Sequence, residues 1–259
     1  MIELDQVCFN WPDGAEVLRD FSLRVVPGEK LVVLGANGCG KSTLLKLLNG
    51  LLFATTGSYR YRGDPVTRQR FRSAPWANRF RRETVLLFQH PEAMLFNPTV
   101  ADEIGYGLRQ MAHAECDGLV LQWAERLGIQ TLLENAPYSL SGGEKKKVAL
   151  AALLALEPQC LLLDEPIANL DPRSSGWLVD HLLTTEATVI VVTTHNLSMA
   201  AELGERCLIM DEQGAIRFDG PVRQALADMD LLQQANLVHR HQHRHGSFSH
   251  SHPHVHDWE

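Results

Sequence analysis

The chain has 259 residues, 45% hydrophobic and 21% charged, which is typical of a soluble globular protein with one large domain or a domain and a subdomain. Its formal net charge is −7 with neutral histidines, and this balance argues against nucleic acid as the main partner, because phosphate binding needs a clustered positive field. We expect no membrane-spanning segment, because no apolar run approaches roughly 18 residues, no signal peptide, and no disulfide framework, because the five cysteines are scattered without a C-x-x-C pair.

The first motif along the chain is a glycine-rich loop between a predicted strand and a predicted helix. Residues 30–34 are a short aliphatic run, residues 35–42 read G-x-x-x-x-G-K-S, and residues 43–52 have helical apolar spacing. Glycines let such a loop curl so that its backbone N–H groups point at phosphate oxygens, and the helix adds its positive N-terminal end. We expect Lys41 to contact the β- and γ-phosphates and Ser42 to offer its hydroxyl to Mg²⁺. The predicted nucleotide-binding residues of this loop are Gly35, Ala36, Asn37, Gly38, Cys39, Gly40, Lys41, Ser42 and Thr43.

A second anion site is predicted where Ser141, Gly142 and Gly143 precede a strongly helical segment that runs to Leu156. A hydroxyl, unpaired backbone amides and a helix N-terminus together favour bound negative charge. One nucleotide does not need two γ-phosphate sites in one chain. We therefore infer that this second site serves a nucleotide held by another subunit.

Two acidic residues follow the buried strand predicted at Cys160–Leu163, and a histidine follows the next predicted strand, residues 188–194. In open α/β sheets the ligand lies beyond the carboxyl ends of the strands. Asp164 is expected to face Mg²⁺, and Glu165 to polarise the attacking water as general base. His195 is expected at the same edge, where it could contact the γ-phosphate and orient Glu165 and the water.

The phosphate loop and four further motifs, which follow it along the chain at residues 89, 140–144, 168–172 and 195, resemble those of the ABC ATPase family over residues 1–220. LSGGE at 140–144 is similar to the family signature LSGGQ, and ANLDP at 168–172 is similar to its D-loop. Gln89 resembles the Q-loop glutamine, to which the family assigns catalytic and Mg²⁺ contacts, and His195 resembles the switch histidine. The resemblance implies a head-to-tail dimer, homomeric or pseudo-symmetric, with ATP between one subunit's phosphate loop and the partner's signature.

The same resemblance implies the fold and the contact to adenine. The expected fold is α/β, a P-loop NTPase (RecA-like) core with an antiparallel β subdomain and an inserted helical signature subdomain. The expected divisions are residues 1–89 and 157–220 for the core with the β subdomain, 90–156 for the helical subdomain, 221–238 for a C-terminal helix and 239–259 for a disordered tail. Trp11 aligns with the aromatic residue that stacks on adenine, and Phe9 is then expected in the core.

The segment LLFQHPEAMLFNPTVADEIGYGL, residues 86–108, resembles the ATPases of energy-coupling-factor importers, although His90, Glu92, Ala93 and Met94 depart from their pattern. In those importers a groove behind the Q-loop receives a helix of the membrane subunit. The apolar run 94–96 could be exposed for that contact or could pack inside the helical subdomain. The eight arginines of residues 60–82 could face the membrane, but we favour a solvated hairpin and loop.

The last segment is rich in histidine, with eight of the twelve histidines of the chain. Imidazole binds nickel, cobalt, zinc and copper, so this tail could hold Ni²⁺ or Co²⁺, or could be a solvated segment without a role. The candidate ligands are His239, His241, His243, His245, His250, His252, His254 and His256.

These observations predict an ATP- and Mg²⁺-dependent ATPase subunit of an energy-coupling-factor importer for nickel or cobalt. Its expected place is the cytoplasmic face of a bacterial or archaeal cell membrane. Its expected partners are a second ATPase subunit, a transmembrane coupling subunit and a substrate-capture membrane subunit, with no nucleic acid. The alternatives are the same motor in a vitamin importer, and a soluble ABC ATPase in metal-cofactor assembly.

Overall fold

The computed structural model describes residues 1–185, 188–245 and 248–255, and beyond Val238 only the backbone is described. Its centre is a six-stranded sheet in the order β10-β9-β3-β8-β7-β6. Strands β3, β6, β7, β8 and β9 run parallel, and β10 adds an antiparallel edge. The strands are β3 (Lys30–Leu34), β6 (Thr84–Leu87), β7 (Cys160–Asp164), β8 (Val189–Thr194), β9 (Arg206–Met210) and β10 (Ile216–Pro221). The middle strands are buried along their whole length, which explains their continuous apolar sequences.

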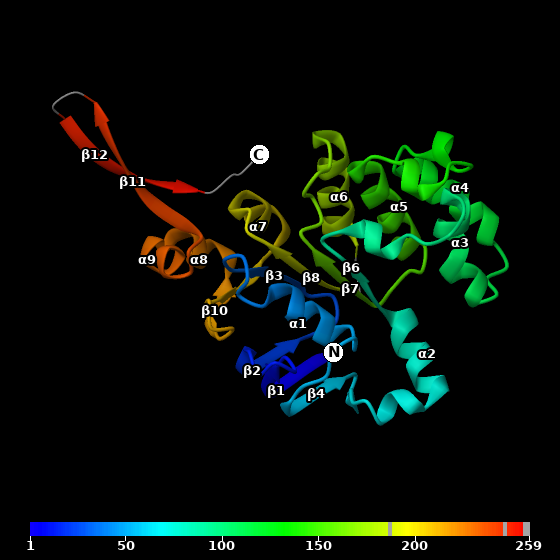
Figure 1. Ribbon diagram of the computed structural model, residues 1–259, viewed down its shortest axis with the longest axis horizontal. Coiled ribbons are helices and arrows are strands. Elements are labelled where there is room, and N and C mark those ends of the chain that lie inside the picture. Colours follow the sequence, from blue (N-terminus) through cyan, green and yellow to red (C-terminus); the bar gives the residue numbers. More distant parts are fainter. Residues whose placement is uncertain (186–187, 246–247, 256–259) are drawn as a thin grey trace.

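An antiparallel sheet in the order β2-β1-β4-β5 covers one side of this centre. Its strands are β1 (Ile2–Asn10), β2 (Glu16–Val25), β4 (Thr56–Tyr61) and β5 (Asp64–Pro65). Helix α1 (Lys41–Leu48) lies between the two sheets (Figure 1), and its leucines share one apolar core with residues of both. The loop before α1 is therefore held between two packed layers.

A helical subdomain is inserted between β6 and β7. It contains α3 (Val100–Gln110), α4 (Cys116–Arg126) and α5 (Gly142–Leu154), with the short helices η2 (Pro91–Met94), η3 (Gln130–Leu132) and η4 (Pro137–Ser139). Helices α6 (Pro172–Thr184) and α7 (Leu197–Leu203) cover the central sheet, and their buried faces join the same core as α3 to α5. The α/β core, the antiparallel subdomain and the helical insertion agree with the fold expected from the sequence.

Residues 60–82 differ in part from the expected hairpin and loop. The β4–β5 hairpin is present, but it is followed by η1 (Arg70–Arg72) and helix α2 (Ala74–Glu83). Trp76 and Phe80 lie one turn apart, are buried, and stack with ring centroids 5.1 Å apart. Asp64 accepts hydrogen bonds from Arg79 and from the Trp76 indole N–H. This helix was not predicted from the sequence, because its few buried apolar residues lie among arginines.

The C-terminal region also differs from expectation. Strands β9 and β10 form an antiparallel pair before it. In place of one helix there are two, α8 (Val222–Ala227) and α9 (Met229–Gln234), because the Asp228 side chain accepts a hydrogen bond from the Leu231 amide and starts a new helix.

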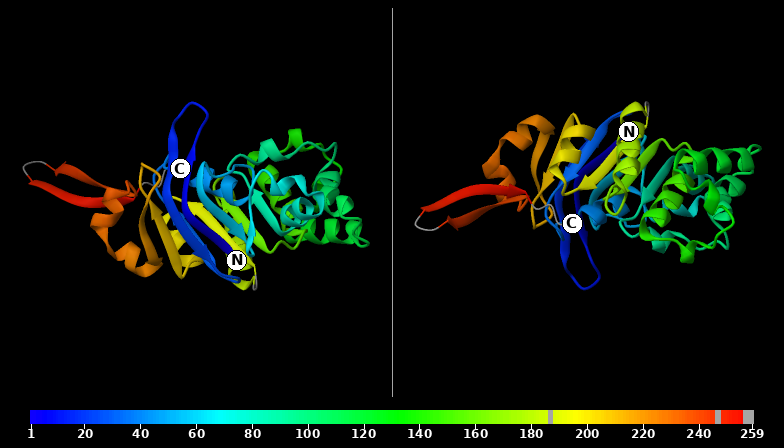
Figure 2. Two further views of the ribbon diagram at one scale, coloured as in Figure 1. Left: turned by 90° about the horizontal axis from the view of Figure 1, so that it is seen from below. Right: turned by 90° about the horizontal axis from the view of Figure 1, so that it is seen from above.

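Where the composition predicts a disordered tail, the backbone of β11 (Val238–His245) and β12 (Phe248–Val255) forms an antiparallel pair. Such pairing uses backbone groups, so a low apolar content does not prevent it. Both views of Figure 2 place this pair and the helical subdomain at opposite ends of the molecule. His256 lies outside the described residues, and for the other seven tail histidines only the backbone is described.

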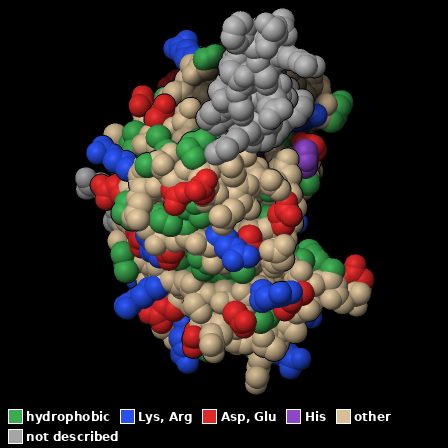
Figure 3. All heavy atoms as spheres, turned by 90° about the vertical axis from the view of Figure 1, so that its left-hand side faces the viewer, with side chains coloured by type: hydrophobic (Ala, Val, Ile, Leu, Met, Phe, Trp, Pro, Cys, Tyr) green, Lys and Arg blue, Asp and Glu red, His purple; other side chains and the backbone are tan. Residues whose placement is uncertain are grey.

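Across residues 1–185, 188–245 and 248–255, none of the helices combines the length and the apolar character needed to cross a bilayer. On the face that carries α8 and α9, acidic and basic side chains are interspersed (Figure 3). This face therefore presents no continuous stripe of one charge among its described residues.

Candidate nucleotide-binding and hydrolysis site

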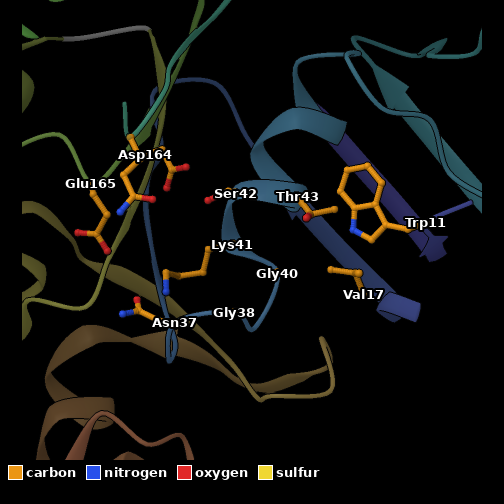
Figure 4. Close-up of a pocket in the computed structure, with 11 residues that line it drawn as sticks. Trp11, Val17, Asn37, Gly38, Gly40, Lys41, Ser42, Thr43, Asp164 and Glu165 are labelled. Carbon is orange, nitrogen blue, oxygen red and sulfur yellow. The ribbon is translucent and has the colours of Figure 1, made fainter. Parts of the chain in front are cut away.

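A cavity of about 310 Å³ opens at the carboxyl ends of β3 and β7. The phosphate loop and α1 form its floor, Trp11 and Val17 close one side, and Asp164 and Glu165 lie on the other (Figure 4). The described residues that line it are Trp11, Val17, Asn37, Gly38, Gly40, Lys41, Ser42, Thr43, Gln89, Asp164 and Glu165. Predicted residues from four separate segments thus meet in one cavity.

The phosphate loop has the backbone shape that an anion cradle needs. Gly40, directly before α1, has φ +103°, and a Cβ there would lie 3.0 Å from the Val17 carbonyl oxygen. Glycine is therefore required both by its backbone angle and by the close approach of β2. Lys41 Nζ donates to the carbonyl oxygens of Gly35 at 2.6 Å and Ala36 at 3.0 Å. An ammonium has three N–H donors, so one remains for a phosphate oxygen.

Three residues of the predicted loop lie behind the cavity. Gly35 and Ala36 supply the carbonyls that orient Lys41, and Cys39 is buried beneath the loop. Burial raises the pKa of the Cys39 thiol. Cys39 therefore supports the loop as a small apolar side chain rather than as a nucleophile.

The two carboxylates are held by hydroxyls from the neighbouring strand. Thr193 Oγ1 donates to Asp164 Oδ1 at 2.6 Å, and Thr194 Oγ1 donates to Glu165 Oε2 at 3.2 Å. Both carboxylates are nearly buried, and both threonines are fully buried. The sequence analysis assigned no role to these threonines. Their position at the end of a buried strand, directly before His195, was the signal that could have identified them.

His195 lies beside the predicted general base. Its Nδ1 is 2.8 Å from Glu165 Oε1, while the imidazole is 40% exposed. The ring thus holds one carboxylate oxygen of Glu165 and is itself partly exposed, although His195 is not among the described residues that line the cavity. Glu165 also has φ +47°, an unusual backbone angle for a residue other than glycine.

Trp11 follows β1 at the opposite side of the cavity. The residue is 37% exposed, and its ring meets the Phe9 ring edge-on, with centroids 5.1 Å apart. Phe9 is buried in the core, as expected. Phe9 thus supports the indole, while the exposed part of Trp11 borders the space where a base can stack.

The signature residues do not reach this cavity. Ser141, Gly142 and Gly143 start α5, and none of them is among the described residues that line it. Ser141 and Glu144 form a capping box, in which the Ser141 hydroxyl and amide donate to Glu144 Oε2 at 2.7 and 2.8 Å. The hydroxyl bond is the main cause that lowers the pKa of Glu144. The second anion site predicted from the sequence would therefore lie on a separate surface of the same chain.

Comparison with known proteins agrees with this geometry. The sequence profile of the ABC transporter family matches residues 18–168. A protein of Methanosarcina acetivorans is 37% identical over 246 residues, covering 92% of this chain and 89% of its own. A protein of Caldanaerobacter subterraneus subsp. tengcongensis is 40% identical over 242 residues, covering 92% and 99%. Both relatives are named provisionally as ABC transporter ATP-binding proteins.

Two solved structures have the same fold. CbiO1 from Clostridium perfringens, described as part of the ABC transporter complex CbiONQ, superposes with a TM-score of 0.73 at 28% identity, covering 91% of this chain and 94% of its own. The ATP-binding cassette MJ0796, described as a dimeric post-hydrolysis state with ADP and Pi, gives 0.77 at 23% identity, covering 86% and 99%. The chain belongs to the ABC transporter ATPase family, as a subunit that binds ATP and couples its hydrolysis to transport.

Proposed function

We propose that this chain is the ATPase subunit of an energy-coupling-factor importer that takes up nickel or cobalt ions. The observation that carries the proposal is the surface formed by residues 94–106, the segment whose sequence resembles that importer class. Phe96 is 67% exposed and meets the half-exposed Tyr106 ring edge-on, with centroids 4.9 Å apart. Met94 and Leu95 pack partly against the core, so the run 94–96 is divided between the interior and the surface.

The backbone around Phe96 is held in place by a buried carboxylate. Glu103 is buried and its Oε2 accepts from the Phe96 amide at 2.9 Å, the Asn97 amide at 2.7 Å and the Asn97 side chain at 3.0 Å. A rigid, exposed aromatic pair suits the binding of an apolar helix from a membrane subunit. The similarity to CbiO1, itself described as part of a multi-subunit transporter complex, supports this reading. The subunit would then lie at the cytoplasmic face of the membrane.

Two ATPase subunits would act as a head-to-tail dimer. The separation of Ser141–Gly143 from the cavity of their own chain supports this arrangement, because a second phosphate site then has a use. Each ATP would be enclosed by one subunit's phosphate loop and by its partner's signature. The N-terminus of α5, where Ser141 and Gly142 are exposed, would provide the required anion-binding end.

Hydrolysis needs a water in line with the γ-phosphate and a group to take its proton. Glu165 accepts that proton as general base, and its oxygens are oriented by His195 and Thr194. Lys41 and the loop amides stabilise the negative charge of the phosphates as the bond to ADP breaks. When the two subunits enclose the nucleotide, bulk water is excluded from the site. Release of phosphate then lets the subunits separate.

The oxygen donors at this edge fit Mg²⁺. Ser42, Gln89 and Asp164 line the cavity together, and the Thr193 bond fixes one Asp164 oxygen. A hydroxyl, an amide oxygen and a carboxylate are the hard ligands that Mg²⁺ prefers. When bound, the ion neutralises charge on the β- and γ-phosphates. Nickel or cobalt would be the cargo of the importer and would not occupy this site.

The tail supports the choice of cargo through its composition. Its backbone register pairs His239 with His254, His241 with His252 and His243 with His250. No group of three or more metal-ligating side chains occurs among the residues whose side chains are described, which end before this segment. We expect Ni²⁺ or Co²⁺ titrated into the full chain to bind at pH 7.5 and to dissociate at pH 5.5, as imidazoles protonate. A chain with the tail histidines changed to asparagine is the control, and equal binding by both chains would contradict the assignment.

Metal uptake tests the function directly. Cells that carry the complete transporter should accumulate ⁶³Ni or ⁵⁷Co in an ATP-dependent manner, and Lys41→Ala in this subunit should abolish the accumulation. Uptake of a vitamin in place of metal would keep the importer and replace its cargo. A stable complex with only soluble partners would instead favour an ABC ATPase of metal-cofactor assembly. Phe96→Ser should lose co-purification of the membrane subunit while its melting temperature stays near that of the wild type.

A further inference from the structure

Lys146, in the second turn of α5, is a buried cation that the ATP site does not use directly. Its side chain is 1% exposed, and an ammonium buried this deeply must be hydrogen-bonded. Nζ donates to the carbonyl oxygen of Glu165 at 2.9 Å and to that of Ala168 at 2.7 Å. Burial lowers the pKa of Lys146, and the nearby carboxylates of Glu165 and Asp164 act in the opposite direction.

The two carbonyls that Lys146 binds are the two ends of one tight turn. The Ala168 amide donates to the Glu165 carbonyl oxygen at 3.3 Å, so this oxygen accepts from the turn and from Lys146. Glu165, the first residue of the turn, and Asn169, the residue after it, have φ of +47° and +64°. Backbone angles of this kind persist only where surrounding contacts hold them. Lys146 is such a contact, and it acts on the backbone that carries the general base.

The start of α5 touches the same segment at two more points. A Cβ on Gly143 would lie 2.9 Å from the Asn169 carbonyl oxygen, so the helix and the segment are in close contact. Lys147 Nζ lies 2.9 Å from Asp171 Oδ2. The signature helix and residues 165–171 are therefore joined through Gly143, Lys146 and Lys147 and should move together.

We propose that Lys146 is a positioning residue that couples the signature of one subunit to the general base of the same subunit. In the head-to-tail dimer of the proposed function, on which this inference rests, Ser141–Gly143 would bind the partner's nucleotide. When that nucleotide binds, the start of α5 shifts or becomes more rigid. Lys146 transmits this change in α5 to the backbone of Glu165. Hydrolysis in one site thereby depends on occupancy of the other.

Steady-state hydrolysis by the full-length protein tests the coupling. Lys146→Met keeps an apolar stem and removes both hydrogen bonds, and it should lower kcat at least tenfold with a KM for ATP within threefold of wild type. Lys146→Gln keeps two N–H donors and should recover part of kcat. An equal loss of kcat and rise of KM in both variants would show a merely structural role and overturn the proposal. If the methionine variant does not fold, the glutamine variant and wild type carry the comparison.

Thr188→Val is the matched control. Thr188 is buried and donates to the Pro158 carbonyl oxygen at 3.0 Å, so its loss also removes a buried donor. It lies at the amino ends of β7 and β8, across the sheet from the ATP site. Lys146→Met must lower kcat more than Thr188→Val does at a comparable melting temperature. Equal effects would overturn the proposal.

A dimerisation measurement separates failure of this inference from failure of the dimer itself. Glu165→Gln, in which hydrolysis is slowed, should dimerise with ATP in size-exclusion chromatography with light scattering. A wild-type kcat in Lys146→Met, with the dimer intact, would refute only the coupling role of Lys146. If no dimer forms with ATP, both the dimer of the proposed function and the coupling are refuted.

Discussion

Replacing Glu165 with glutamine isolates the negative charge that we assign to the general base. Glutamine has nearly the same shape and can keep both neighbours, because its amide can donate to His195 Nδ1 and accept from Thr194 Oγ1. The buried site is therefore preserved, and stability should change by no more than about 1 kcal/mol. The substitution leaves the phosphate loop and Lys41 untouched.

The expected loss of turnover follows from the removed proton acceptor. General-base catalysis contributes roughly 10²–10⁴-fold, so kcat should fall by that factor, equivalent to about 3–5 kcal/mol of activation free energy. ATP binding should persist or tighten, since Glu165 forms no hydrogen bond with the loop among the described residues and its charge repels the γ-phosphate.

Phosphate release at saturating Mg·ATP measures kcat, and titration with a fluorescent ATP analogue measures binding. Glu202→Gln is the matched control, because Glu202 lies exposed on α7 and should retain wild-type turnover. Turnover of Glu165→Gln within threefold of wild type would refute the general-base assignment. A parallel loss of nucleotide binding would show that Glu165 acts in the ground state instead.

Lys41→Ala should raise the Kd for ATP roughly 10- to 150-fold, since a hydrogen bond to a charged group contributes about 1.5–3 kcal/mol; calorimetric titration would measure it, and a Kd within threefold of wild type would contradict the phosphate contact. Trp11→Ala should raise the same Kd roughly 5- to 150-fold by removing about 1–3 kcal/mol of base stacking, whereas Trp11→Phe should keep most of the affinity; equal losses in both variants would argue against stacking. Burial, with a smaller effect from Arg126, lowers the pKa of His181, so the unfolded chain binds this proton first and stability is lost as pH falls below about 6.5. His181→Phe keeps a ring on Trp177, where the two rings now stack 5.2 Å apart, and its melting temperature should fall less than that of wild type between pH 7.5 and 5.5; an equal fall would exclude a contribution from His181.

Much of the site could be predicted because its residues lie in short motifs at strand ends. The phosphate loop is contiguous, and Asp164, Glu165 and His195 each follow directly on a buried strand. In a parallel sheet the carboxyl ends of neighbouring strands share one edge, so local order along the chain predicts proximity in space. Trp11, which the family resemblance aligned with the residue that stacks on adenine, lies beside the cavity, and Phe9 lies in the core.

Other features depend on partners far along the chain. The helix α2 was not predicted from its arginine-rich sequence, although Trp76 and Phe80, which lie four positions apart and pack on an aromatic cluster, were a signal that could have identified it. The division of the run 94–96 between interior and surface was also undecided by sequence. Glu103, seven residues after Phe96, settles it by binding the amides of that loop.

By itself the sequence determined which residue types stand at each place: a glycine-rich loop for phosphates, a pair of carboxylates that we expect to serve metal and water, and a signature that we expect to bind a second phosphate. Those properties reside in residue type and close spacing, which any correct fold must preserve. Only the tertiary structure decided how the pieces support one another. Thr193 and Thr194 orient the carboxylates from another strand, and Lys146 ties the signature helix to the Glu165 backbone. These are contacts between residues 19 to 29 positions apart, and they exist only after the sheet has brought its strand ends together.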